Sequence, residues 1–153
     1  MKFKQSFIKT DFGNLLLTFS EEGLHTIQFD AKDGDVVFEH SNKNQYVDQL
    51  KEFFSGKRKA FNLPLVLVGT PFQTKVWEYL QRIPYAETRT YQQVAEGIGH
   101  PKSSRAVGNA NHVNPIPIII PCHRVVRSDG DLGGFGGGID IKQGLLDFEK
   151  KNA

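Results

Sequence analysis

The sequence has 153 residues and a formal net charge of +2, from 19 basic and 17 acidic side chains, which excludes a strongly basic or strongly acidic protein. Cys122 is the only cysteine, which excludes an internal disulfide and a metal site made of several thiolates. No apolar run approaches the roughly 18 residues that span a bilayer, and the N-terminal MKFKQSF lacks the apolar core of a signal peptide. We therefore expect a protein of the reducing cytoplasm, or of the nucleus if the source is eukaryotic.

The first part of the chain, residues 1–68, is predicted to form a structural α/β domain built on an antiparallel β-sheet. Three short apolar or alternating runs are separated by the turn-rich segments TDFGN and SEEG, which is typical of a β-meander. The runs cover residues 3–8, 15–19 and 24–29. Apolar residues then recur at helical spacing from Val47 to Phe54, and Gly56 ends that helix.

The second part, residues 69–153, is predicted to form a mainly helical domain, which places the whole chain in the α+β class. Thr70 and Gln73 have the spacing of a capping box, with a proline between them at the first helical position. Thr90 and Gln93 repeat that spacing at the start of a second, short helix that closes on glycine. A turn leads from there into a third helix. The second and third helices therefore have the outline of a helix-turn-helix.

The third helix, SSRAVGNANHVN from Ser103 to Asn114, has a nearly bare surface. Small residues follow one another at Ala106, Gly108 and Ala110, although a mid-helix glycine costs roughly 1 kcal/mol relative to alanine. Arg105 lies in the first turn, where the helix dipole disfavours a cation. Either this face packs closely on another helix beside an ordinary exposed arginine, or it approaches a ligand closely with Arg105 projecting into it.

Charge is distributed unevenly in the second part of the chain. The segment 97–127 contains no Asp or Glu, and its basic residues are Lys102, Arg105, Arg124 and Arg127. Such a segment would suit a polyanionic partner, but four cations over this length are also ordinary for a solvated surface.

Cys122 lies in IPCHRVV, directly after the extended apolar segment NPIPIII. A lone cysteine in that setting is commonly a small buried hydrophobe. However, His123 and Arg124 bring a base and a cation within reach of the sulfur, an arrangement that lowers a thiol pKa and activates a nucleophile. Because neighbours in a strand face opposite ways, contact between Cys122 and His123 requires a turn or a bridging water.

The C-terminal helix, IDIKQGLLDFEKK, offers a partner for that histidine. Its apolar face is predicted to consist of Ile141, Leu145 and Phe148. Glu149 projects beside this face toward the interior, where a carboxylate needs a hydrogen-bond or charge partner such as His123. Cys122, His123 and Glu149 would then form a nucleophile, a base and an orienting group, unless Glu149 simply reaches solvent.

The glycine-rich segment GGFGGG, residues 133–138, is not a P-loop, because no strand precedes it and no Lys-Ser/Thr pair follows it. It is either a flap over a pocket, with Phe135 at its tip, or a flexible connector.

Four segments, taken in order, resemble the O6-alkylguanine-DNA alkyltransferases, also called methylated-DNA-protein-cysteine methyltransferases. They run from Gly69 to Glu149 and read GTPFQTKVW, IPYAETRTYQQVA, SSRAVGNANHVNPIPIIIPCHRVV and GGFGGGIDIKQGLLDFE. PCHRV in that setting is a specific signature, whereas the N-terminal third matches the family more loosely. The resemblance implies a ribonuclease H-like N-terminal domain and a C-terminal domain that binds DNA and transfers alkyl groups.

The resemblance also implies roles for individual residues. Cys122 is expected to be the nucleophile, His123 its water-linked base and Glu149 the partner of that base. Asn114 is expected to brace the active-site turn. Tyr91 would crowd the 3′ phosphate, assist rotation of the nucleotide and stabilise the departing guanine.

In such a protein, duplex DNA would bind through its minor groove to the third helix, and Arg105 would be the arginine finger that fills the space of a flipped nucleotide. The expected DNA-binding residues are Thr90, Ser104, Arg105, Ala106, Gly108 and Ala110. The expected guanine pocket is lined by Tyr91, Pro117, Val125, Phe135, Gly136 and Gly137. The resemblance further implies a monomer, with cooperative binding along DNA left open.

The implied reaction is a direct displacement. The thiolate of Cys122 attacks the alkyl carbon on guanine O6, or more weakly on thymine O4, and keeps the alkyl group as a thioether. Each molecule therefore acts once, without a cofactor, and the scattered histidines predict no zinc site. Asn111 and Gly136 depart from some relatives, which place a bulkier apolar residue and a serine there, so the size of adduct accepted is left open.

Two other functions remain possible from the residues. One is a non-catalytic protein that recognises alkyl lesions, although such relatives lack the reactive cysteine. The other is a cysteine hydrolase with a Cys-His-Glu triad, which would need an oxyanion hole that the sequence does not indicate. An alkyltransferase would transfer one alkyl group per protein, a recognition protein would transfer none, and a hydrolase would turn over many times.

Overall fold

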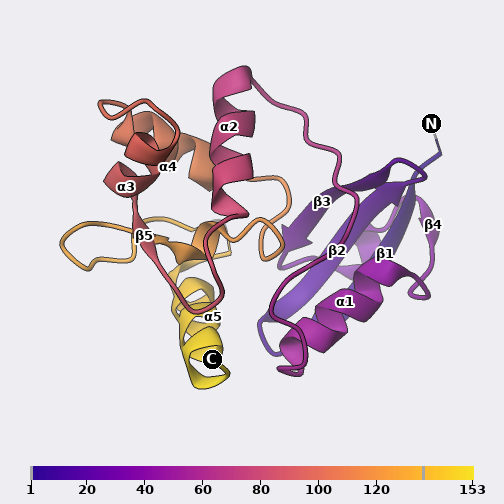
Figure 1. Cartoon of the computed structure of the whole chain (residues 1–153). Coiled ribbons are helices and arrows are strands. Elements are labelled where there is room, and N and C mark those ends of the chain that lie inside the picture. Colours follow the sequence, from indigo (N-terminus) through magenta and orange to yellow (C-terminus); the bar gives the residue numbers. More distant parts are fainter. Residues whose placement is uncertain (1, 136) are drawn as a thin grey trace. The chain divides into compact units, whose positions relative to one another are not determined.

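The computed structural model describes residues 2–135 and 137–153, and the chain divides into two compact units, Met1–Leu67 and Val68–Ala153. Figure 1 labels helices α1 to α5 and strands β1 to β5. The α+β class predicted from the sequence is confirmed, with a sheet in the first unit and most of the helices in the second. Among the described residues, no helix is long and apolar enough to cross a membrane.

The first unit is built on a four-stranded sheet of order β3-β2-β1-β4. Strands β1 (Lys4–Thr10), β2 (Gly13–Ser20) and β3 (Gly23–Phe29) form the predicted antiparallel meander. The short strand β4 (Glu39–His40) was not predicted and pairs parallel to β1, which makes the sheet mixed. Its two polar, exposed residues carry no hydrophobic alternation, so the sequence pattern alone does not reveal it.

Helix α1 (Gln45–Phe54) supplies the other half of the core of this unit. It begins at Asn44, whose side chain accepts a hydrogen bond from the Val47 amide. Its buried face packs aromatic rings on the sheet, with the centroids of Tyr46 and Phe19 5.0 Å apart. A 3₁₀ turn, η1 (Asp33–Asp35), lies in the connection from β3 to β4.

The second unit consists of short helices around one small parallel strand pair. The helices are α2 (Pro71–Leu80), α3 (Tyr91–Gly97), α4 (Ser104–His112) and α5 (Ile139–Lys151), with the 3₁₀ turn η2 (Cys122–Arg124). Both predicted capping boxes are confirmed, at Thr70 and Gln73 before α2 and at Thr90 and Gln93 before α3. Helices α3 and α4 are joined by a short turn and pack on each other, and α2 packs on both.

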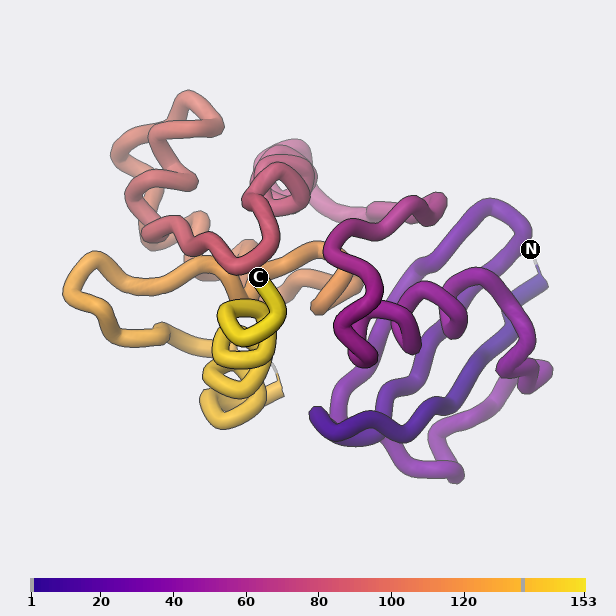
Figure 2. Tube along the Cα trace, turned by 60° about the horizontal axis from the view of Figure 1, so that its bottom comes forward, coloured from indigo at the N-terminus to yellow at the C-terminus, as the bar shows by residue number. Residues whose placement is uncertain are grey.

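The strand pair fixes the relation between two parts of the unit that are distant in sequence. Strand β5 (Arg89–Thr90) pairs in parallel with β6 (Val125–Val126). β5 leads directly into α3, and β6 directly follows η2, so the pairing brings the start of α3 beside the turn that contains Cys122. A long loop follows β6 and leads to α5, as Figure 2 shows.

Candidate functional site

Cys122 is the first residue of η2 and is buried, with 4% of its surface exposed. The proline-rich approach to it forms a tight turn, in which Ile118 has a positive φ of 75° and the Ile120 amide donates to the Ile116 carbonyl. A tight turn rather than a continuous strand therefore presents the cysteine. Amides at the start of a helical turn favour a negative charge, which is the electrostatic setting of a thiolate.

Asn114 holds this turn from the side. Its Nδ2 donates to the Ile120 carbonyl at 2.8 Å, and its Oδ1 accepts from the Ile116 amide at 3.0 Å. Asn111, on α4, donates from Nδ2 to the carbonyl of Cys122 at 3.3 Å. Two asparagines thus hold the backbone before and after the Cys122 side chain.

His123 and Glu149 form a fully buried pair. The Nε2 of His123 lies 2.6 Å from Oε2 of Glu149, and both side chains have 0% exposure. The predicted interior position of Glu149 is therefore confirmed. The other ring nitrogen of His123, Nδ1, is buried and has no hydrogen-bond partner among residues 2–135 and 137–153.

Arg124 completes a charged network around the carboxylate. Its guanidinium donates to both oxygens of Glu149, at 2.8 and 2.9 Å, and to the Ile83 carbonyl at 2.8 Å. The Ala86 amide donates to Oε1 of Glu149 at 3.1 Å. The expectation that Arg124 provides a cation for the sulfur is wrong, because its charge is engaged by Glu149.

The charge state of this network determines which nitrogen of His123 can act as a base. Burial alone would raise the pKa of Glu149, but hydrogen bonds from His123 and Arg124 lower it to about 2. The ionised carboxylate can only accept hydrogen bonds, so Nε2 of His123 carries the ring proton. Burial also lowers the pKa of His123, which keeps the ring neutral and leaves a lone pair on Nδ1.

Lys142, which the sequence analysis missed, is the cation near the sulfur. It is completely buried on α5, and its Nζ donates to the carbonyls of Val125, at 2.5 Å, and Leu132. The buried face of α5 consists of Lys142, Leu145 and Glu149, whereas the predicted face of Ile141 and Phe148 is only partly covered. The signal was available, because Lys142 lies seven residues, or nearly two turns, before Glu149.

Two opposing effects act on the Cys122 thiol. Burial raises its pKa to about 11, while hydrogen bonding from Asn114 and the charge of Lys142 favour the thiolate. Burial likewise lowers the pKa of Lys142 to about 8, so most of the lysine is protonated at neutral pH. The resting cysteine is thus a neutral thiol, and a base must remove its proton when it reacts.

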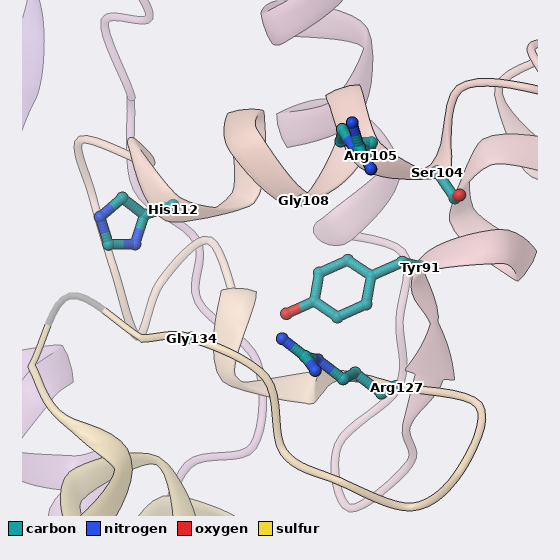
Figure 3. Close-up of a pocket in the computed structure, with 7 residues that line it drawn as sticks. All are labelled: Tyr91, Ser104, Arg105, Gly108, His112, Arg127 and Gly134. Atoms are coloured by element: carbon teal, nitrogen blue, oxygen red, sulfur yellow. The ribbon is translucent and has the colours of Figure 1, made fainter.

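A cavity of about 390 Å³ opens beside this network, between α4 and the loop that follows β6 (Figure 3). The residues that line it are Tyr91, Ser104, Arg105, Gly108, His112, Arg127 and Gly134. Tyr91 occupies the middle of the view in Figure 3. A side chain at Gly133 would place its Cβ 2.5 Å from the Tyr91 hydroxyl, and Gly133 has a positive φ of 73°, so only glycine suits that position.

Comparison with known proteins places the whole chain in one family. Residues 71–151 match the family model of the 6-O-methylguanine DNA methyltransferase DNA binding domain, and residues 3–67 match its ribonuclease-like domain. The chain belongs to the 6-O-methylguanine DNA methyltransferase family. The resemblance carried by PCHRV and its flanking segments is therefore confirmed.

Similar proteins cover nearly the full length of this family member. A methylated-DNA-protein-cysteine methyltransferase of Methanosarcina barkeri is 44% identical over 95% of this chain and 96% of its own length. The crystal structure of the Mycobacterium tuberculosis O6-methylguanine methyltransferase has a TM-score of 0.89, with 39% identity over 99% of this chain and 94% of that one. The structure of the Mycobacterium tuberculosis protein in complex with DNA has a TM-score of 0.90, with 40% identity over 98% and 94%.

The cavity contains four of the residues expected to contact DNA or the substrate: Tyr91, Ser104, Arg105 and Gly108. Ala106 is exposed on α4, and Thr90 caps α3 with its side chain. Ala110 does not belong to that surface, because it is 2% exposed and its carbonyl accepts a hydrogen bond from Trp77 Nε1 at 2.9 Å.

Of the residues expected to line a guanine pocket, Tyr91 lines the described cavity, whereas Pro117, Val125, Phe135 and Gly137 are not among its lining residues. Pro117 and Val125 are buried beside the Cys122 turn, and Gly137 is half-buried in the glycine-rich loop. Phe135 is buried, with 8% of its surface exposed, and whether its loop is a flap over a pocket or a connector stays a prediction. Gly136 lies outside the described residues.

Proposed function

We propose that this family member repairs DNA by transferring the alkyl group of O6-alkylguanine irreversibly to the sulfur of Cys122, once per molecule. The observation that carries the assignment of the acceptor is the pair His123–Glu149 directly after Cys122. Both side chains are buried, Glu149 is ionised and the His123 ring is neutral, so Nδ1 of His123 is left with a basic lone pair. The thioether product is stable, so the molecule is consumed in the reaction.

In the proposed step, the Cys122 sulfur attacks the alkyl carbon, a carbon–sulfur bond forms and the carbon–oxygen bond to guanine breaks. The thiol proton passes to Nδ1 of His123 through a bridging water, which suits neighbours in a tight turn. Tyr91 gives a proton to the departing base, so that guanine leaves neutral. Lys142 stabilises the thiolate that develops, and Asn114 holds the turn in the attacking geometry.

The raised pKa of Cys122 supports selectivity for a bound substrate. A thiol with a pKa of about 11 is almost entirely protonated at neutral pH, so it reacts slowly with electrophiles in solution. The thiolate would form only when an alkylated base lies against the sulfur and the thiol proton can pass to His123. This protects a protein that can react only once.

We further propose that α3 and α4 act as a helix-turn-helix that binds duplex DNA through its minor groove. Ala106, which is exposed, and Gly108, which is half-buried, form a surface of small residues that would allow the backbone of DNA to approach closely. Arg105 would enter the space of the flipped nucleotide, with Thr90 and Ser104 as further contacts. Around the flipped guanine, the pocket would be completed by Tyr91, Pro117, Val125 and the loop 135–137.

All of these residues belong to the second unit, so we assign DNA binding and transfer to residues 69–153 and a structural role to residues 1–68. We infer a monomer that works in a reducing compartment, the cytoplasm of a prokaryote or the nucleus of a eukaryote. A free thiol at Cys122 is a condition of the reaction, and such compartments keep thiols reduced.

The decisive experiment is intact mass spectrometry with peptide mapping after the protein is mixed with an equimolar duplex containing one O6-methylguanine. We expect a gain of one methylene mass on Cys122 that saturates at one per protein. An unchanged mass with tight binding of the lesion would indicate a recognition protein without chemistry. Release of product over many turnovers would indicate a hydrolase.

A further inference from the structure

Arg127 is a cation of the cavity that the reaction does not use. It follows β6 and lines the cavity from the loop side, while Arg105 lines it from α4. In Figure 3 the guanidinium of Arg127 extends toward the hydroxyl of Tyr91, and Arg105 stands on the other side of the Tyr91 ring. Two arginines therefore flank the tyrosine that is expected to meet the target nucleotide.

Arg127 has no carboxylate partner in the described part of the chain. Its side chain has neither a hydrogen bond nor an ion pair with any residue of 2–135 or 137–153, whereas the side chains of Arg89 and Arg124 each contact a carboxylate. None of the seven residues that line the cavity is acidic. Asp131, in the same loop, lies close enough to affect the pKa of Lys142 but makes no ion pair with Arg127.

Arg127 also lies near other positive charge, which is unfavourable without an anion. The charge of Arg127 contributes to the lowered pKa of Lys142, after the larger effect of burial. Burial raises the pKa of Tyr91, and the charge of Arg127 opposes that increase. The described residues that line the cavity include two arginines and no carboxylate, and the Nζ of Lys142 lies 5.9 Å from the centre of the Tyr91 ring. Such a cavity attracts an anion.

We propose that Arg127 binds a backbone phosphate of the target strand beside the flipped nucleotide and so positions that nucleotide against Tyr91, an assignment that rests on the proposed function. A guanidinium donates two parallel hydrogen bonds to a phosphodiester, which fixes direction as well as distance. Gly108 and Gly134 leave two walls of the cavity without side chains, so a sugar-phosphate chain can approach closely. Arg127 is thus a DNA-positioning residue and not a catalytic one.

The test compares Arg127→Ala and Arg127→Lys with a matched control, Arg82→Ala, which removes an exposed arginine from a different groove of the same unit. Affinity for duplex DNA is measured over a salt series, because each phosphate contact contributes about 0.9 to the slope of log K against log salt. The rate of alkyl transfer is measured on a duplex containing O6-methylguanine and on the free base O6-methylguanine, which has no phosphate.

We expect Arg127→Ala to reduce the slope of log K against log salt by about 0.9, the value for one phosphate contact. The rate of alkyl transfer from the duplex should decrease by about tenfold. The rate with the free base should change by less than about twofold, and Arg82→Ala should match the wild type in all three measurements. Arg127→Lys should keep the salt slope, because the charge remains. It should recover only part of the rate, because a lysine cannot make the paired hydrogen bonds.

Two results would overturn the proposal. An equal loss of rate on the duplex and on the free base would show that Arg127 affects proton transfer from Tyr91 to the departing base and does not bind a phosphate. An unchanged salt slope in Arg127→Ala would show that the guanidinium is merely solvated. Failure of the wild-type protein to transfer alkyl groups from either substrate would instead refute the proposed function. Thermal melting of each variant confirms that it is folded.

Discussion

The two units of the chain bury different kinds of polar side chain. The first unit buries uncharged ones, namely Gln5, Ser6 and Ser20. The second buries Asn111 and four side chains that carry or can gain a charge, namely His123, Arg124, Lys142 and Glu149. Burial of a charge is far more unfavourable than burial of an amide or a hydroxyl, so such a concentration needs a reason beyond folding.

The hydrogen bonds of these groups indicate what each set does. Gln5 accepts from the amides of Val37 and Phe38, at 2.8 and 3.0 Å, and so holds the edge of the sheet. In the second unit, the network around Glu149 satisfies every oxygen of the carboxylate yet leaves Nδ1 of His123 without a partner in the described part of the chain. Polar burial completes the fold in one unit and prepares a reactive group in the other.

The largest expected effect is that of Cys122→Ser on alkyl transfer. A hydroxyl in place of the thiol has nearly the same shape, but it is a much weaker nucleophile, so transfer should fall to the background rate. Binding of duplex DNA should be unchanged, because the buried sulfur does not reach the DNA-facing surface. Intact mass after incubation with the O6-methylguanine duplex measures alkyl transfer, and fluorescence anisotropy measures DNA binding. Persistent transfer in this variant would refute the mechanism.

Glu149→Gln should come next, with a loss of both stability and activity. The variant leaves the buried charge of Arg124 without its partner, and breaking a buried pair typically costs about 3–5 kcal/mol in free energy of unfolding. The rate of transfer should decrease as well, because the amide no longer fixes the tautomer of His123. Asp147→Asn is the matched control, since Asp147 is exposed on the same helix and bonds only Gln143 among described residues. It should cost less than about 0.5 kcal/mol.

The pH dependence of stability should follow from the same carboxylate. Its pKa decreases from an ordinary value of 4.5 to about 2 on folding, so its stabilising contribution is complete above pH 4.5 and is lost as the pH falls toward 2. The contribution is on the order of 3 kcal/mol. Urea unfolding of the wild type between pH 6 and about 2.5 should show this loss. Glu149→Gln should lack most of it, and an equally steep curve in that variant would assign the acid sensitivity to other groups.

The features predicted correctly from the sequence are those decided by neighbouring residues. The starts of α2 and α3 follow from the capping boxes at Thr70 and Thr90, which need only residues three apart. The interior position of Glu149 follows from the helical periodicity of α5. Strand β4 was missed because its pairing depends on contacts with residues more than thirty positions earlier, such as the bond from the Ser41 amide to the Gln5 carbonyl.

The features of the site that the sequence did not reveal depend on how buried charges are shared. Arg124 was expected to act on the sulfur because it is two residues from Cys122. It instead forms an ion pair with Glu149, which is twenty-five residues away in sequence. Lys142 was overlooked because a lysine in a helix usually faces solvent, and here two carbonyls satisfy it inside the unit. Periodicity can place such a residue on a face, but it cannot say which charges will pair.

The smallest expected effect concerns Gln5, a buried polar side chain of the first unit. Gln5→Ala removes the acceptor for the amides of Val37 and Phe38, and it should lower the free energy of unfolding by about 1–2 kcal/mol. Gln28→Ala, an exposed position on the same sheet, should change it by less than about 0.5 kcal/mol.

Neither glutamine variant should alter the rate of transfer per folded molecule, because Gln5 belongs to the unit whose polar groups only complete the fold. Single-turnover rates, corrected for the folded fraction at each temperature, measure this. If Gln5→Ala slowed the chemistry itself, the first unit would contribute more than stability, and the division of labour between the two kinds of polar burial would fail. If the rate is unchanged, destabilising the first unit affects repair only through the amount of folded protein, whereas a change at Glu149 affects every molecule that is folded.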